Sequence, residues 1–193
     1  MPGIPTLTGQ HVRLEKLSPD HASGLWEASR FDEIWSYMPK RPRTLDEMCA
    51  MIESFTTPTY LDSNKPYAII EAASNAVIGS TQLLDIDWAN RGAEIGWTWL
   101  TPRVWRSPVN TECKLLLLAH CFETLKFLRV QLKTDARNER SQKAIERLGA
   151  VREGVLRRHR ILSDGFVRDS VYYSIVSEEW PAVRDRLNFA LRR

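Results

Sequence analysis

The stretch Glu94-Ile95-Gly96-Trp97-Thr98-Trp99-Leu100 decides the fold. Its apolar and aromatic residues predict a strand over Ala93–Leu100. A basic loop with Arg103 and Arg106 follows, and a helix is predicted over Thr111–Thr124. A strand–loop–helix unit of this kind often holds a phosphate, because free backbone N–H groups and the helix dipole converge on one anion. An ordinary loop with solvated arginines is an equally good interpretation of this segment alone.

A second segment with ligand-binding character follows the next predicted strand, Arg129–Thr134. It reads Asp135-Ala136-Arg137-Asn138-Glu139-Arg140-Ser141 and opens a helix predicted over Glu139–Leu148. Ligands of open α/β sheets bind at the carboxyl ends of strands, so both loops are expected to face one crevice. Asn138 is also a good N-cap for the backbone near Ser141, and that role is compatible with a ligand contact.

The flanking segments complete a sheet-and-helix pattern. Ser18-Pro19 and the Thr44/Glu47 capping box each predict a helix start, and Gly149 predicts a left-handed helix stop. The predicted strands are His11–Leu17, Pro66–Glu71, Val77–Asp85 and a hairpin of Val151–Ile161 and Val167–Val176 across Ser163-Asp164-Gly165; the predicted helices are 18–30, 44–55 and Glu178–Leu191; loops are expected at 38–43, 56–59 and 101–108. The fold class is therefore α/β, with a mixed, mostly antiparallel sheet of about seven strands and helices on both faces.

Composition limits the function classes. The 193 residues are expected to form one domain over 1–193, and 43% hydrophobic with 26% charged residues excludes a disordered chain, a collagen or a coiled coil. The longest apolar run, Leu115–Ala119, is too short to span a bilayer, and Met1–Thr6 lacks the features of a secretory signal, so a cytoplasmic protein is expected. A net charge of +3 is too small to argue for a nucleic-acid partner. The three cysteines are expected to be reduced thiols, and no spacing suggests a metal site.

From about Arg91 to Val176 the chain resembles the GNAT superfamily of acyl-CoA-dependent N-acyltransferases. Within that superfamily it resembles the branch of ribosomal-protein N-terminal acetyltransferases, and the opening strand and helices fit the same pattern. The residues that carry the resemblance are Glu94–Trp97, Trp99-Leu100, Trp105–Thr111, Asn138–Ser141, Leu148–Arg157, Asp164-Gly165 and Arg168–Tyr173.

The resemblance implies an N-acetyltransferase that uses acetyl-CoA as co-substrate and no metal. A primary amine, either a protein N-terminus or a small molecule, would attack the thioester directly, without an acyl-enzyme. The strand ending at Trp99-Leu100 would pair with the pantetheine arm, and the loop 106–111 would hold the pyrophosphate. Asn138 would form a hydrogen bond with the pantetheine, and Ser141 would lie near the sulfur. The resemblance is also compatible with a homodimer. The short apolar runs argue against a membrane partner, and the small net charge argues against nucleic acid. The residues implied to bind the cofactor are Trp99, Leu100, Arg106, Ser107, Asn110, Thr111, Asn138 and Ser141.

The loop departs from the family pattern of basic-x-x-Gly-x-Gly/Ala. Trp105, Pro108 and Asn110 occupy the basic, first-glycine and second-glycine places, and proline has no N–H to donate. Either side chains of Arg106, Ser107, Asn110 and Thr111 replace the missing donors, or coenzyme A binds weakly. The alternative functions are a non-catalytic acyl-CoA-binding sensor and a basic nucleic-acid-binding module.

Glu94 is the first candidate for the base that accepts the amine proton. Strand alternation predicts that Glu94, Gly96 and Thr98 share one face, with space beside the carboxylate at the glycine. The alternative interpretation is an exposed or ion-paired strand glutamate, and Asp85 is a second candidate base. Ser141 is the first candidate acid for the leaving thiolate, before Tyr172 and Tyr173; Cys113 and Cys121 are expected in the core.

Overall fold

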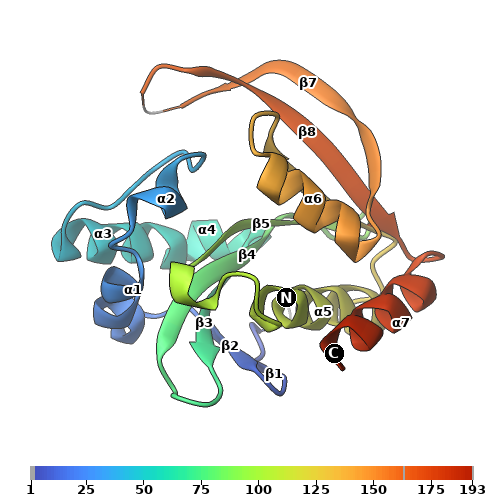
Figure 1. Ribbon diagram of the computed structural model, residues 1–193, viewed down its shortest axis with the longest axis horizontal. Helices are drawn as coiled ribbons and strands as arrows, with labels where there is room; N and C mark the ends of the chain where they lie inside the picture. The colour runs from blue at the N-terminus through green and yellow to red at the C-terminus, as the bar shows by residue number, and fades with distance from the viewer. Residues whose placement is uncertain (1–2, 163, 193) are drawn as a thin grey trace.

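The computed structural model describes residues 3–162 and 164–192, and the described strands form one mixed sheet (Figure 1). The strand order is β1-β2-β3-β4-β5-β6-β8-β7. Neighbouring strands are antiparallel except β5 and β6, which run parallel. The predicted mixed, mostly antiparallel sheet is confirmed, with the two-residue strand β1 added at one edge. The strands are β1 (Leu7–Thr8), β2 (Val12–Lys16), β3 (Lys65–Glu71), β4 (Val77–Asp87), β5 (Gly92–Leu100), β6 (Arg129–Asp135), β7 (Val151–Ile161) and β8 (Val167–Val176).

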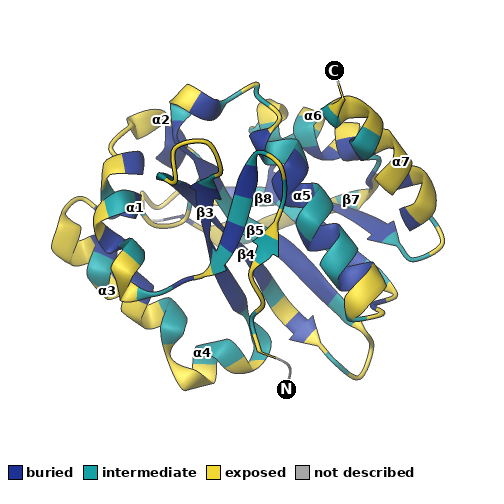
Figure 2. Ribbon diagram, turned by 90° about the horizontal axis from the view of Figure 1, so that it is seen from below, coloured by how far each residue is buried: buried dark blue, intermediate teal, exposed yellow. Residues whose placement is uncertain are grey.

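Helices cover both faces of the sheet because alternate residues of the inner strands are apolar on each side. Ala68 and Ile70 of β3 pack in one core, whereas Tyr67 and Ile69 pack in the other. The first core lies under α1 (Ala22–Ala28), α2 (Asp32–Trp35) and α3 (Leu45–Thr56), with α4 (Pro58–Ser63) beside β4; the second lies under α5 (Val109–Ala119), α6 (Glu139–Leu148) and α7 (Trp180–Leu191). The central strands are buried, while the outer faces of the helices are exposed (Figure 2). Among the described residues, no helix has the length and apolar character to cross a membrane.

Several predicted element boundaries were wrong for local reasons. The segment 56–59 was expected as a loop, but Thr57 Oγ1 accepts the Tyr60 N–H (3.2 Å) and Pro58 occupies the first turn, so α4 begins there. The helix expected over 18–30 is divided into the 3-10 helix η1 (Pro19–His21) and α1, and α2 was not predicted. The long helix begins at Val109 and ends in a π-helical turn, η3 (His120–Thr124), while η2 (Pro102–Val104) lies in the basic loop.

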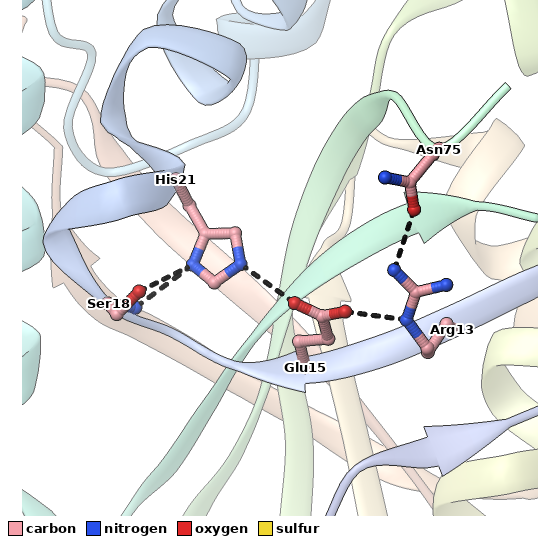
Figure 3. Close-up of polar contacts among 5 residues, drawn as sticks. All are labelled: Arg13, Glu15, Ser18, His21 and Asn75. Carbon is pink, nitrogen blue, oxygen red and sulfur yellow. Dashed lines mark hydrogen bonds and ion pairs between the residues drawn. The ribbon is translucent and has the colours of Figure 1, made fainter.

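Polar side chains fix the turn between β2 and η1 (Figure 3). Nδ1 of His21 lies 3.0 Å from Ser18 Oγ and 3.1 Å from Ser18 N, which confirms Ser18 as the N-cap. Nε2 of the same histidine lies 3.2 Å from Glu15 Oε2. Arg13 donates to the other oxygen of Glu15 (2.5 Å) and to Asn75 Oδ1 (2.7 Å), so these contacts also tie β2 to the β3–β4 turn.

The β7–β8 hairpin extends beyond α6 at the end of the sheet (Figure 1). Most of β7 is exposed because it is the last strand in the order. Gly149 ends α6 with φ of +102°, and Gly165 has φ of +85° in the hairpin turn, as the two predicted turns require. Residue 163 of the predicted turn lies outside the described residues, as do residues 1–2 of the predicted N-terminal segment and residue 193.

Candidate active site

β5 and β6 separate after a short parallel ladder. Their register covers only Gly92, Ala93 and Glu94 of β5, which face residues 129–131 of β6. Beyond that point β5 remains paired with β4 and β6 remains paired with β8. The backbone edge of β5 over 95–100 therefore has no strand partner on the β6 side. This separation lies between the N-termini of α5 and α6.

A β-bulge at Trp97 reverses which side chains at the end of β5 face α5. Trp97 and Thr98 lie opposite the single β4 residue Thr81, and Trp97 has φ of +49°. After a bulge of this kind the alternation of side chains is reversed. Thr98 consequently faces α5, where Lys114 Nζ donates to Thr98 Oγ1 (2.6 Å). The prediction that Thr98 shares a face with Glu94 was wrong for this reason.

Glu94 is a buried, ion-paired carboxylate. Its Oε2 accepts hydrogen bonds from Lys133 Nζ (2.7 Å) and Gln131 Nε2 (3.0 Å), and the residue is 1% exposed. The ion-paired alternative is therefore the arrangement in the structure. Oε1 receives no hydrogen bond from a described residue. A Cβ at Gly96 would lie 2.8 Å from Oε1, so the glycine leaves the space beside this oxygen that the sequence predicted.

Further polar groups lie on the Glu94 face of the sheet and were not identified from the sequence. Gln82, paired in register with Gly96, is 1% exposed and accepts a hydrogen bond from Tyr60 Oη (2.6 Å). Its Nε2 is buried without a partner among the described residues. The only signal available in the sequence was a polar residue within an apolar strand. Burial, with the charge of Asp85 nearby, raises the pKa of Tyr60 to about 12, so its hydroxyl stays protonated.

The N-terminus of α5 is open although Pro108 replaces the expected glycine. Pro108 is the N-cap, so its missing N–H removes one of the four donors at this helix end. The N–H groups of Asn110 and Thr111 have no acceptor among the described residues, and Arg106 has φ of +61° in the preceding turn. Ser107 Oγ is already engaged, because it donates to Val104 O (2.6 Å). Backbone donors therefore remain where the resemblance implies a pyrophosphate.

The two loops are linked by a cation–π contact. The guanidinium of Arg140, at the start of α6, lies 4.0 Å from the ring of Trp105. Trp105 is fixed in turn, because its Nε1 donates to Leu100 O (2.8 Å). Arg103, in contrast, pairs through both terminal nitrogens with Glu71 (2.9 Å each). Arg140 thus brings its charge to Trp105, the position that is basic in the family pattern.

Asn138 is the N-cap of α6, and its Oδ1 accepts the Ser141 N–H (3.0 Å). The predicted capping role is confirmed. Nδ2 of Asn138 and Oγ of Ser141 make no hydrogen bond with the described residues, so both remain available to a ligand. Trp99 and Leu100 are buried, and their packing leaves only the backbone of this part of β5 to pair with another molecule.

The other residues considered for catalysis, Tyr173, Asp85 and the two helix cysteines, lie in surroundings that differ from those of Glu94 and Ser141. Tyr173 Oη donates to Glu146 Oε1 (3.1 Å) of α6. Asp85 is exposed at an irregularity of β4, with φ of +49°. Cys113 and Cys121 are buried as expected, and burial raises the pKa of Cys113 to about 12 and that of Cys121 in the same direction. A thiolate nucleophile is therefore disfavoured at both cysteines.

Glu112 of α5 is a structural anchor that sequence analysis missed. Its carboxylate accepts the backbone N–H groups of Gln10 (2.8 Å), His11 (2.6 Å) and Val12 (2.8 Å). A Cβ at Gly9 would lie 2.4 Å from the Glu112 carboxyl carbon, so glycine is needed for this close approach. The anchor fixes the first half of α5 against the start of β2.

Comparison with known proteins agrees with this architecture. Residues 11–151 match the model of the acetyltransferase (GNAT) domain family. The chain is 28% identical over 178 residues to the "Putative ribosomal N-acetyltransferase YdaF" of Bacillus subtilis, covering 89% of this chain and 94% of the relative.

Solved structures show the same fold. A GCN5-related N-acetyltransferase from Brucella melitensis superposes with a TM-score of 0.92 at 29% identity, covering 98% of this chain and 86% of the other. Mycobacterium smegmatis RimJ in complex with CoA-disulfide superposes with a TM-score of 0.83 over 97% of this chain and 95% of the other, and at 20% identity this likeness concerns the fold alone. The family match spans most of the chain and includes the strand–loop–helix segments described above. The chain therefore belongs to the GNAT family of acetyltransferases, and the protein is an N-acetyltransferase.

Proposed function

We propose that this protein transfers the acetyl group of acetyl-CoA to a primary amine by direct attack in a ternary complex. The observation that carries the proposal is the separation of β5 from β6 between the N-termini of two helices. The backbone edge of β5 near Trp99 and Leu100, which has no strand partner on the β6 side, can pair with the amide groups of a pantetheine arm, although Leu100 O already accepts one hydrogen bond from Trp105 Nε1. The free Nδ2 of Asn138 and Oγ of Ser141 lie at the start of α6, on the β6 side of that separation.

The pyrophosphate would bind at the N-terminus of α5. The N–H groups of Asn110 and Thr111, the helix dipole and the Arg106 side chain supply donors and positive charge there. Arg140, held on Trp105, supplies a cation near the place where the family pattern has a basic residue. Ser107 contributes by fixing the turn, because its hydroxyl is engaged by Val104 O.

The chemistry requires one proton acceptor and one proton donor. The neutral amine attacks the thioester carbonyl carbon, the new C–N bond forms, and the C–S bond breaks with its electron pair leaving on sulfur. Glu94 Oε1, which has no hydrogen-bond donor of its own, would accept the amine proton directly or through water. Ser141 Oγ would donate a proton to the leaving thiolate. Positioning of the two substrates can account for much of the rate, up to about 7–11 kcal/mol of the barrier.

A protein N-terminus is the acceptor that we favour over a lysine side chain. An α-amino group has a pKa of about 7.7–8.0, against about 10.4 for lysine, so less free energy is needed to deprotonate it. The name of the Bacillus subtilis relative points to a ribosomal substrate for that protein, which supports the same class here. A small-molecule amine is the second candidate, because the Glu94 face carries several polar groups.

The experiment is release of free thiol from acetyl-CoA with a panel of amines, combined with calorimetric titration of coenzyme A. We expect binding that is weakened in Arg140→Ala and in Arg106→Ala, and thiol release that depends on the amine. Arg160→Ala, on exposed β7, is the matched control and should leave binding unchanged. Binding without amine-dependent thiol release would identify the sensor alternative, and absence of binding at millimolar coenzyme A would contradict the proposal.

A further inference from the structure

Arg168 of β8 is a buried cation that forms no ion pair with the described residues. The residue is 9% exposed, and its Nε donates to Ser170 Oγ (3.1 Å). Its Nη1 and Nη2 make no hydrogen bond or ion pair with any residue in the described part of the chain. A charged group that has lost its water and has no direct ion pair costs free energy, so proteins seldom keep one without a use.

The two carboxylates whose charges act on Arg168, Asp135 and Glu94, are each ion-paired with another cation. Asp135 accepts hydrogen bonds from Arg137 Nε (3.0 Å) and Nη2 (2.8 Å), and Glu94 is paired with Lys133. The residue opposite Arg168 on β7 is Arg160, a second cation. Like charges at opposed positions of a sheet repel each other, so this neighbour adds to the cost. The local charge balance therefore favours the addition of an anion.

Arg168 lies on the same face of the sheet as Glu94. Val171 and Tyr173 of β8 belong to the core under α6, so the alternate residues Arg168 and Ser170 face the opposite side. In β5, Ala93 and Ile95 belong to that same core, which places Glu94 on the opposite side as well. Burial lowers the pKa of Arg168, and the charges of Asp135 and then Glu94 oppose that lowering, so Glu94 is near enough to act on Arg168.

We infer that Arg168 binds a carboxylate of the acceptor, so that the substrate class is a primary amine that also carries a carboxylate. This inference rests on the proposed function and specifies its acceptor. The planar guanidinium offers two parallel N–H donors that match the two oxygens of a carboxylate. Glu94 suits the amine of such a molecule, and Arg168 suits its acid group. The carboxylate can belong to a free amino acid or to an acidic residue at the N-terminus of a peptide.

The test compares matched acceptors that differ only in the acid group. One pair is glutamate α-amide with glutamine α-amide, and the other is a C-terminally amidated peptide that begins with Asp against one that begins with Asn; a third pair, alanine against alaninamide, probes the α-carboxylate. The ratio of kcat/KM within each pair is measured for the wild type, Arg168→Met and Arg168→Lys. The change in this ratio between variants cancels differences in intrinsic amine reactivity. Arg160→Met is the control, since it removes the exposed cation opposite Arg168.

We expect the wild type to prefer the acidic member of at least one pair by roughly tenfold to hundredfold, as for hydrogen bonds to a charged group. Arg168→Met should abolish that preference, Arg168→Lys should keep part of it, and Arg160→Met should retain it. The pair that shows the preference distinguishes an amino acid from an acidic peptide. Removal of an unpaired buried charge should also leave the Tm of Arg168→Met equal to or above that of the wild type.

Two outcomes would overturn the inference directly, and a third case calls for a binding measurement. The first is acetylation of amines with no preference for the acidic members, which would leave the proposed acetyl transfer intact. The second is a preference that survives in Arg168→Met. The third applies if no amine is acetylated, in which case the proposed function fails and the site is tested by calorimetry with N-acetylglutamate. Binding that is lost in Arg168→Met would then support the carboxylate site, and absence of binding to the wild type would refute it.

Discussion

Replacement of Glu94 by glutamine tests the proposed base most directly. The substitution keeps the shape of the side chain and removes its ability to accept the amine proton. A general base contributes about 10²–10⁴-fold, so turnover at neutral pH should fall by that order. The loss should be largest at low pH, where the amine is mostly protonated. It should shrink as the pH approaches the amine's own pKa of about 7.7–8.0.

The structure also sets the stability cost that must be separated from this effect. Glutamine can still accept a hydrogen bond from Gln131, but it leaves Lys133 without the carboxylate that lies 2.7 Å away. Lys133 is 17% exposed and can turn toward water, so the cost should be about 1–3 kcal/mol. The double variant Glu94→Gln/Lys133→Met removes the unpaired ammonium. It should recover stability without recovering turnover.

The assay is steady-state thiol release from about pH 6 to about pH 9, which brackets the α-amino pKa, with Tm and coenzyme A affinity measured on the same preparations. Coenzyme A affinity should barely change, because Glu94 lies on the face opposite α5, whose N-terminus is the proposed phosphate site. Wild-type turnover in Glu94→Gln at neutral pH would exclude Glu94 from the mechanism. Equal recovery of Tm and turnover in the double variant would assign Glu94 a structural role only.

Three further predictions concern residues around the site. Gly9→Ala should displace the Glu112 carboxylate from its three N–H donors and lower the free energy of unfolding by about 2–4 kcal/mol, measured by chemical denaturation. Gly154→Ala is the control, because no atom lies within 4 Å of the new Cβ, and it should leave the free energy of unfolding almost unchanged. Burial lowers the pKa of Lys114 from 10.5 to about 8, so between these pH values the unfolded chain binds more protons than the folded one and stability rises with pH. Lys114→Met should remove about 3 kcal/mol of that rise relative to the wild type. Identical pH profiles of stability for the two proteins would contradict the buried placement of Lys114. Asn138→Ala should cost about 1 kcal/mol of stability as a lost N-cap and also weaken coenzyme A binding, while an unchanged calorimetric Kd would limit Asn138 to capping.

The sequence by itself determined the features that depend on neighbours a few residues apart. The N-cap of Asn138, the N-cap of Thr44 and the left-handed stop at Gly149 are local, and each is confirmed at its predicted position. The second half of the predicted capping box is not formed, because the Glu47 carboxylate accepts the N–H of Arg43 (2.6 Å) and not that of Thr44. The order of strands and helices along the whole chain predicted the mixed sheet, and the combination of segments from Glu94 to Tyr173 indicated the family. The helix at Pro58 was missed although its signal was equally local, because the short segment 56–59 was interpreted only as a loop.

Tertiary structure decided the features that join residues far apart in the chain. The bulge at Trp97 arises from pairing with β4, and it moved Thr98 to the α5 face against the simple alternation. The partner of Glu94 is Lys133, 39 residues away, and it lies alongside only because β6 follows β5 in the sheet. Whether Arg168 has an anionic partner likewise depends on which strands flank β8. Strand order and register are collective properties of the packed sheet, so no local pattern could assign these contacts.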